Sequence, residues 1–154
     1  MTYDVTHYQI PMQQNDSRSL NLMTRLDPRI AVLIPCYNEE IAISAVVRDF
    51  RAALPKASIF VFDNNSCDRT VEIAREAGAI VRQVPLQGKG NVVRRMFSDV
   101  DADAYILVDG DDTYHAASAP ALVARLFAEN LDMVVSRRVT DEASAYRSGH
   151  RIGN

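Results

Sequence analysis

The fold of this chain is decided by a short apolar run that ends in carboxylates. Residues 104–112 read Ala-Tyr-Ile-Leu-Val-Asp-Gly-Asp-Asp. Such a run is typical of a strand that is buried on both faces of a parallel sheet. Asp109 and Asp111 would then emerge at the carboxyl end of the strand, where ligands of open α/β sheets bind. Gly110 between them has no Cβ and lets the backbone turn tightly, so we expect the two carboxylates to converge on one centre.

The acids at this strand end predict a metal site. Three neighbouring carboxylates repel one another unless a cation is present. Asp109 and Asp111 are hard oxygen donors with no His or Cys among them, so they suit Mg²⁺ or Mn²⁺ rather than Zn²⁺. Mg²⁺ commonly joins protein carboxylates to substrate phosphates, which points to a metal-diphosphate site. The alternative is an ordinary turn, because Asp and Gly are frequent turn residues.

The composition limits the class of protein. The chain has 154 residues, of which 47% are apolar, and a net charge of −3. This is enough for about one domain with a core, and it gives no reason to expect a nucleic-acid partner. Cys36 and Cys67 stand in no metal-binding or redox spacing, which fits a reducing compartment. We therefore expect a cytoplasmic protein. We also expect a polar N-terminal arm over residues 1–28, which is loosely ordered or docked, and one domain over residues 29–154.

Strands and helices alternate along that domain. Strands are predicted over residues 29–35, 58–63, 79–82, 104–108 and 131–136. The segments between them carry apolar residues at helical spacing, and Asn38 is expected to cap the first helix. This alternation predicts the α/β class with a mainly parallel sheet.

Candidate nucleotide-binding residues follow the first two strands. Tyr37 could stack on a flat base, and Glu39 could accept a hydrogen bond from it. The alternative is a loop aromatic and an acid that is favoured by the helix dipole. Asp63 ends the second strand, where α/β nucleotide folds often hold ribose hydroxyls. The glycine fingerprints of dinucleotide folds and P-loop enzymes are absent from the first turn.

Two basic features could bind phosphate. Lys89 stands between two glycines at the start of a predicted helix, where backbone amides can approach an anion. The segment after residue 136 is rich in arginine, beginning with Arg137. It could hold phosphates of a donor or acceptor, lie on an anionic membrane surface, or be a solvated loop.

Four motifs in this order resemble the family 2 glycosyltransferases of GT-A fold. They are Ile34-Pro35-Cys36-Tyr37-Asn38-Glu39-Glu40, Asp63-Asn64-Asn65-Ser66-Cys67-Asp68-Arg69-Thr70, Gly88-Lys89-Gly90 and Asp109-Gly110-Asp111. The branch that looks most similar is that of the dolichyl-phosphate mannose and polyprenyl-phosphate sugar synthases. The resemblance runs over residues 29–154 and implies a three-layer αβα sandwich of GT-A type.

The resemblance also implies roles for individual residues. Pro35, Tyr37, Glu39 and Asp63 would hold the nucleoside, and Lys89 would lie by the phosphates. Asp109, Gly110 and Asp111 would contact the nucleotide sugar, and the two acids would bind Mg²⁺ or Mn²⁺. Asp109, Asp111 and Arg137 would be the catalytic set, with Arg137 near the sugar-phosphate.

The implied reaction is metal-dependent transfer of a hexose, with inversion, from a GDP-mannose or UDP-glucose type of donor to a polyprenyl phosphate or related acceptor. A lipid phosphate is already ionised and needs no general base, and the sequence offers no convincing base. Such an acceptor would place the protein at the cytoplasmic face of the membrane. A nucleotidyltransferase would instead need a glycine-rich basic loop after the first strand, and none is present.

One departure from the family pattern leaves an alternative open. Family members usually continue well past the position equivalent to Asn154, with elements that close the acceptor side. We therefore expect the N-terminal part of a catalytic domain, truncated at the acceptor side, that works with a missing C-terminal segment or a partner chain. The alternative is a non-catalytic donor-binding remnant or interaction module that binds only nucleotide and metal.

Overall fold

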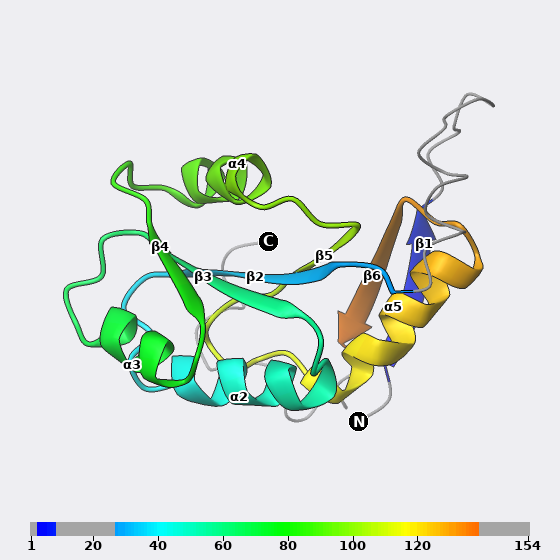
Figure 1. Ribbon diagram of the computed structural model, residues 1–154, viewed down its shortest axis with the longest axis horizontal. Helices are drawn as coiled ribbons and strands as arrows, with labels where there is room; N and C mark the ends of the chain where they lie inside the picture. Colours follow the sequence, from blue (N-terminus) through cyan, green and yellow to red (C-terminus); the bar gives the residue numbers. More distant parts are fainter. Residues whose placement is uncertain (1–2, 9–26, 139–154) are drawn as a thin grey trace, which may run out of the picture.

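The structure is a computed structural model that describes residues 3–8 and 27–138 of the chain. Its elements are β1 (Tyr3–Tyr8), β2 (Ile30–Cys36), α2 (Ile43–Ala53), β3 (Ser58–Asp63), α3 (Thr70–Glu76), β4 (Ile80–Gln83), α4 (Lys89–Asp99), β5 (Ala104–Leu107), the 3₁₀ helix η1 (Ala116–Ser118), α5 (Ala119–Ala128) and β6 (Met133–Arg138). Figure 1 shows their arrangement.

Four strands form a parallel sheet in the order β4-β3-β2-β5. β2 lies in the interior of this sheet and pairs with β3 on one side and β5 on the other. Its residues Val32, Leu33 and Ile34 have no exposed surface. Burying a side chain of this kind contributes about 1.5–3 kcal/mol to stability, which is why β2 is a continuous apolar run. All four strands direct their carboxyl ends to the same edge of the sheet.

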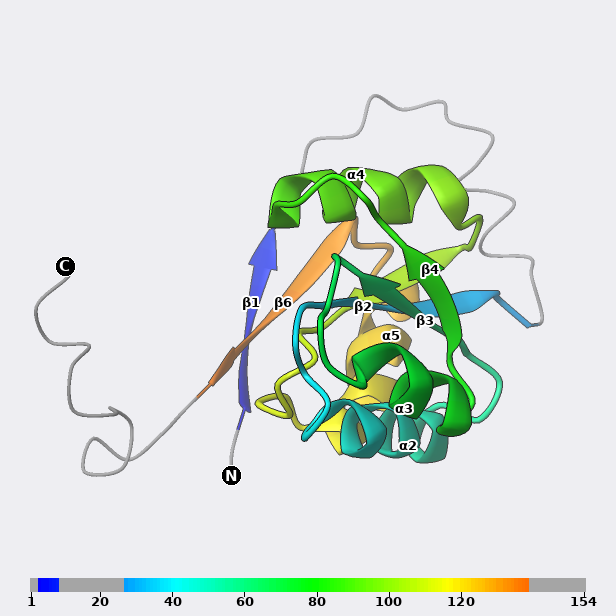
Figure 2. The ribbon, with the colours of Figure 1, turned by 90° about the vertical axis from the view of Figure 1, so that its left-hand side faces the viewer.

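Helices cover both faces of the sheet. In Figures 1 and 2, α2 and α3 lie on one face, α4 lies on the other, and α5 is on the α2 side. One core cluster joins Val47 and Phe50 of α2 to the sheet, and a second joins Val92 and Met96 of α4 to it. The predicted α/β class and three-layer αβα arrangement are therefore confirmed.

The strand that was expected to be buried on both faces is an edge strand. Within the described residues, β5 pairs only with β2. Tyr105 is 36% exposed and Leu107 46% exposed, whereas Ala104 and Val108 are buried. The prediction that this strand is buried on both faces was thus wrong for the face that carries Tyr105 and Leu107. Tyr105 packs edge-to-face with Phe97 of α4, with ring centroids 5.3 Å apart.

A second, two-stranded sheet joins the two ends of the described chain. β1 pairs antiparallel with β6, and Asp4 stands opposite Arg137 in the register. The arm predicted over residues 1–28 thus contributes a strand, which its lack of apolar periodicity did not indicate. The last predicted strand, 131–136, is displaced to Met133–Arg138, so Arg137 lies within the strand rather than after it.

The described residues include no helix with the length and apolar character needed to span a bilayer.

Candidate functional site

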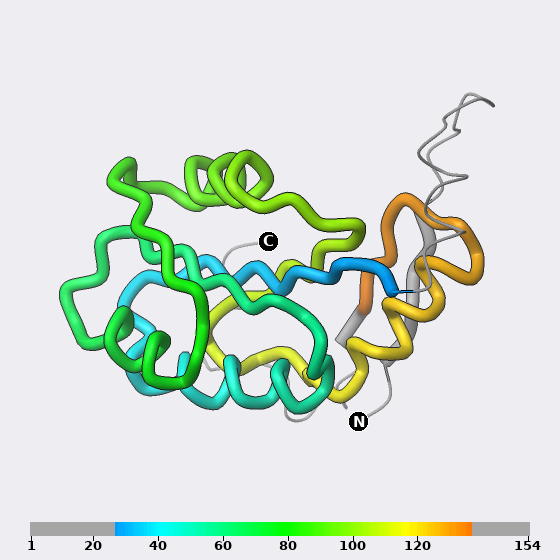
Figure 3. The backbone as a smooth tube through the Cα atoms, viewed as in Figure 1, coloured from blue at the N-terminus to red at the C-terminus, as the bar shows by residue number. Residues whose placement is uncertain are grey.

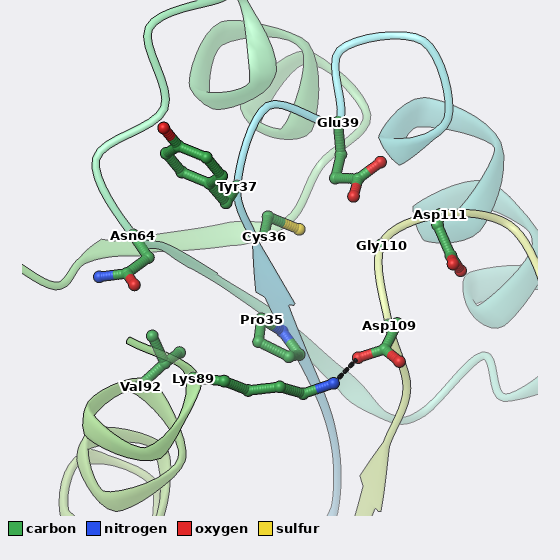
Figure 4. Close-up of a pocket in the computed structure, with 10 residues that line it drawn as sticks. All are labelled: Pro35, Cys36, Tyr37, Glu39, Asn64, Lys89, Val92, Asp109, Gly110 and Asp111. Atoms are coloured by element: carbon green, nitrogen blue, oxygen red, sulfur yellow. Dashed lines mark hydrogen bonds and ion pairs between the residues drawn. The ribbon is translucent and has the colours of Figure 1, made fainter. Parts of the chain in front are cut away.

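A pocket of about 350 Å³ opens at the carboxyl edge of the four-stranded sheet. It is formed by the end of β2, the loops after β2, β3 and β5, and the first turn of α4. Its lining residues are Pro35, Cys36, Tyr37, Glu39, Asn64, Lys89, Val92, Asp109, Gly110 and Asp111. Figure 4 shows Tyr37 and Asn64 on one side, Glu39 and the loop of residues 109–111 on the other, and Lys89 reaching across below them to Asp109. Seven of the eight predicted donor-binding residues are thus brought to one pocket.

The loops after β2 and β3 are locked together by hydrogen bonds, and they lie at the left-hand end of the molecule in Figure 3. Three consecutive backbone N–H groups, at residues 38, 39 and 40, donate to the side chains of Ser66, Thr70 and Asp68. In the other direction, the N–H of Cys67 donates to Asn38 and that of Arg69 donates to Glu40. The first and second sequence motifs therefore meet as one rigid unit.

This unit corrects the prediction for Asn38. α2 begins at Ile43 rather than just after Asn38, and its N-cap residue Ala42 makes no side-chain capping bond. Asn38 has a positive φ of 56°, which Asn tolerates better than most residues, and its Oδ1 accepts the N–H of Cys67 at 2.8 Å. Its side chain therefore ties two loops together instead of starting a helix.

Asp68 belongs to the same unit. Its carboxylate accepts the backbone N–H groups of Glu40 and Thr70 and the hydroxyl of Thr70. Burial alone would raise the pKa of Asp68, but the hydrogen bonds from Thr70 and Glu40 outweigh it and lower that pKa. Its role is structural.

Asn64 fixes the loop that leads to Lys89, and sequence reasoning missed it. Its Nδ2 donates to the carbonyls of Val84 and Leu86, at 2.8 and 2.9 Å, and its Oδ1 accepts the N–H of Gly88 at 2.8 Å. The side chain is buried, and all three contacts go to one loop. The only signal in the sequence was its place directly after the second strand.

Lys89 and Asp109 form an ion pair across the pocket, with Nζ 2.6 Å from Oδ1. The hydrogen bond to Asp109 is the main reason that the pKa of Lys89 is raised. Both side chains are partly exposed, so the pair contributes only about 0–1 kcal/mol to stability. An incoming anion can therefore replace Asp109 as the partner of Lys89, and an incoming cation can replace Lys89 as the partner of Asp109, at a low cost in free energy.

Glu39, Asp109 and Asp111 place three carboxylates along one side of the pocket. Burial and the charges of Asp111, Asp68 and Asp109 raise the pKa of Glu39. Asp111 accepts the N–H and the hydroxyl of Thr113, at 3.2 and 2.7 Å. Asp109 is thus held by Lys89 and Asp111 by Thr113, and the convergence of their carboxylates on one centre stays a prediction.

The donor set nevertheless fits a hard divalent cation. No group of three or more His, Cys, Asp or Glu side chains among the described residues is arranged to hold a metal ion. The carboxylates of Glu39, Asp109 and Asp111 repel one another on one wall, however, and they are oxygen donors of the kind that Mg²⁺ and Mn²⁺ prefer. Substrate phosphates commonly complete such a site.

Two predicted site residues are not in the pocket lining. Asp63 is only 1% exposed, and both of its carboxylate oxygens accept the N–H of Ser66. It ends β3 one residue before Asn64, which does line the pocket. Arg137 lies in β6, and its side chain is outside the described part of the structure. The nucleoside and sugar-phosphate roles of these two residues remain predictions.

Comparison with known proteins identifies the chain. The family model for glycosyl transferase family 2 matches residues 31–153. The chain belongs to this family. Protein RfbJ of Shigella flexneri is 60% identical over 123 residues, which cover 79% of this chain and 95% of RfbJ. A dolichyl-phosphate hexose transferase of Haloferax volcanii is 34% identical over 125 residues, which cover 81% of this chain and 54% of that protein.

Solved structures of glycosyltransferases share the fold. The crystal structure of Mycobacterium tuberculosis glucosyl-3-phosphoglycerate synthase has a TM-score of 0.61 at 25% identity, covering 79% of this chain and 48% of that one. A second structure of that synthase, in complex with Mg²⁺ and UDP, has a TM-score of 0.60 at 25% identity, covering 79% and 46%. The predicted GT-A fold and family are thus confirmed. The chain spans about half the length of these longer relatives.

Proposed function

We propose that this chain forms the donor-binding part of a metal-dependent hexosyltransferase that uses a nucleoside-diphosphate sugar. The observation that carries the proposal is the pocket itself. An aromatic ring, a lysine and a turn with two acids face one cavity at the carboxyl edge of the sheet. In this family 2 chain they offer the three contacts that a nucleoside diphosphate needs.

The pocket residues divide these contacts among themselves. Tyr37 is 52% exposed and can stack on the base, and Glu39 can accept a hydrogen bond from it. Lys89 can move its ammonium from Asp109 to the diphosphate, since the ion pair is weak. Asn64 holds the loop that leads to Lys89, so that this charge stays over the pocket.

Asp109 and Asp111 are the residues that would hold Mg²⁺ or Mn²⁺. A bound cation of this kind acts as a Lewis acid and stabilises the negative charge on a leaving nucleoside diphosphate. The glucosyl-3-phosphoglycerate synthase whose crystal structure contains Mg²⁺ and UDP supports this choice of cofactor and ligand. We include Arg137 as a candidate contact of the sugar-phosphate.

For the acceptor we propose a polyprenyl phosphate, with inversion at the anomeric carbon. The name of the 34% identical dolichyl-phosphate hexose transferase supports a lipid phosphate. A phosphate acceptor is ionised near neutral pH and attacks without a general base. His115, which hydrogen-bonds Ser118 at 3.0 Å, does not line the pocket. Such an acceptor would bring the chain to the cytoplasmic face of a membrane.

A release assay tests this function. The chain is incubated with Mn²⁺ and either GDP-mannose or UDP-glucose, with and without polyprenyl phosphate. We expect release of nucleoside diphosphate only when both the lipid phosphate and the metal are present, and loss of that release in Asp109→Asn. Metal-dependent donor binding without release under any of these conditions would instead identify a donor-binding module.

A further inference from the structure

Gly110 lies against the thiol of Cys36. A Cβ placed on Gly110 would lie 2.6 Å from Cys36 Sγ and 3.4 Å from Glu39 Cγ. The first distance is far shorter than any normal carbon–sulfur contact. Positive φ angles occur at Gly78 and Gly88 but not at Gly110, so glycine is not required at 110 by the backbone conformation. It is required by the space that Cys36 occupies.

Cys36 cannot easily make way. It is the last residue of β2, 3% exposed, and it stands opposite Asp63 in the register of the parallel pair. Its carbonyl accepts the N–H of Asn64 at 2.9 Å, and its thiol contacts the carbonyl of Ile34 at 3.8 Å. Any side chain at 110 would therefore displace the turn rather than the strand.

The turn that would move carries Asp109 and Asp111. We propose that Cys36 is a positioning residue for the divalent-cation site, and that its size sets the distance between the end of β2 and the acid-bearing turn. This inference rests on the proposed function. It assigns to Cys36 a role that needs neither ionisation nor redox chemistry, in keeping with a buried thiol whose pKa is raised mainly by burial.

If this is so, the side chains at positions 36 and 110 share one space, and a larger residue at one position requires a smaller residue at the other. Ala at 110 should push the turn away from β2 and spoil the placement of both carboxylates. Shortening residue 36 should give the added Cβ room and bring the turn back. Ser at 36 keeps one γ atom on a shorter bond, so its effect should lie between those of Cys and Ala.

The test measures the affinity of the chain for Mn²⁺, alone and with UDP, by calorimetry. The variants are Gly110→Ala, Cys36→Ala, Cys36→Ser and the two double substitutions. We expect Gly110→Ala to weaken Mn²⁺ binding about tenfold or more, the factor that corresponds to a moderate overpacking penalty. We expect Cys36→Ala to weaken it about threefold, and the Cys36→Ala/Gly110→Ala double variant to bind no worse than Cys36→Ala. Cys67→Ala, at the exposed second thiol, serves as the control and should bind as the wild type does.

Two outcomes would overturn the inference. Wild-type affinity in Gly110→Ala, or a double variant that binds as weakly as Gly110→Ala or worse, would contradict it. If Gly110→Ala does not fold, recovery of folding in the double variant supports the contact, and failure of the double variant to fold contradicts it. If the wild type binds neither Mn²⁺ nor UDP, the proposed function fails instead, and non-additive unfolding midpoints would still show whether residues 36 and 110 are in contact.

Discussion

Lys89 Nζ lies 2.6 Å from Asp109 Oδ1, so a cationic side chain occupies one of the two carboxylates proposed to hold a metal. The contact joins the start of α4 to the loop after β5 across the mouth of the pocket (Figure 4). In the proposed working state, Lys89 faces the diphosphate and Asp109 faces the cation. The two ligands would then separate Lys89 from Asp109.

This relationship predicts opposite effects of one substitution. Lys89→Met removes the ammonium that competes for Asp109, so Mn²⁺ alone should bind about two- to fivefold more tightly, the value of an exposed ion pair. UDP should bind more weakly, since its diphosphate loses a positive partner. Calorimetric titration with each ligand separates the two effects. Arg94→Met, elsewhere on α4, is the charge-matched control. Weaker binding of Mn²⁺ alone by Lys89→Met would show that the lysine does not compete with the metal.

Asp111 should be needed for the effect of the metal. Asp111→Asn should weaken Mn²⁺ binding at least about tenfold, as changes around metal ligands typically do, and UDP affinity should no longer respond to Mn²⁺. The matched control is Asp112→Asn, which loses the same charge at the next position. Asp112 has a φ of 59°, which Asn accommodates. Equal losses of Mn²⁺ affinity in both variants would mean that the negative charge of the loop attracts the cation and that Asp111 is not a metal ligand.

Asn64 should matter for both stability and nucleotide binding. Asn64→Ala leaves the carbonyls of Val84 and Leu86 and the N–H of Gly88 without their partner, so we expect a loss of about 1–3 kcal/mol in the free energy of unfolding. UDP affinity should fall as well, because the loop before Lys89 is released. Urea unfolding and calorimetry measure the two effects.

The neighbouring residue supplies the comparison for Asn64. Asn65→Gly removes one hydrogen bond, to the carbonyl of Pro85 at 2.7 Å, and keeps a residue that accepts the φ of 66°. It should reduce stability less than Asn64→Ala does. A larger loss in Asn65→Gly would contradict the conclusion that Asn64 is the residue that fixes this loop.

The lowered pKa of Asp68 predicts a pH-dependent contribution to stability. A carboxylate whose pKa is lower in the folded than in the unfolded chain stabilises the fold above its ordinary value of 3.8, and that stabilisation is lost as the pH falls through the folded pKa. Asp68→Asn should therefore lower the thermal midpoint at pH 7, and the difference from the wild type should shrink below pH 3.8. Asp49→Asn, at an exposed acid of α2, removes the same charge elsewhere and is the matched comparison. A difference that is constant from pH 7 to pH 3 would contradict this role for Asp68.

Most of the parallel sheet could be predicted from the sequence, because its strands are continuous apolar runs and the helices between them have a clear apolar face. The edge position of β5 could not be predicted. Periodicity alone does not distinguish a strand with two neighbours from one that pairs on a single side. β1 was missed for a related reason, since its pairing with β6 is a long-range contact that leaves no local apolar pattern.

Five of the residues that the sequence singles out by their own chemistry lie together in the structure. Tyr37, Glu39, Lys89 and the acids at 109 and 111 line one pocket as expected. Residues that act through other residues were missed. Asn64 works by three contacts to a loop twenty or more positions away, and Cys36 by filling the space beside Gly110. Such contacts form only in the folded chain, and no pattern of residue spacing in the sequence predicts them.

The most direct test of this account is calorimetric titration of the chain with GDP-mannose and with UDP-glucose, each in the presence and absence of Mn²⁺. We predict that at least one of the two donors binds and that Mn²⁺ strengthens its binding about tenfold or more, as expected when a cation joins two carboxylates to a diphosphate. Absence of metal-dependent binding to either donor, in a chain that unfolds cooperatively, would contradict it.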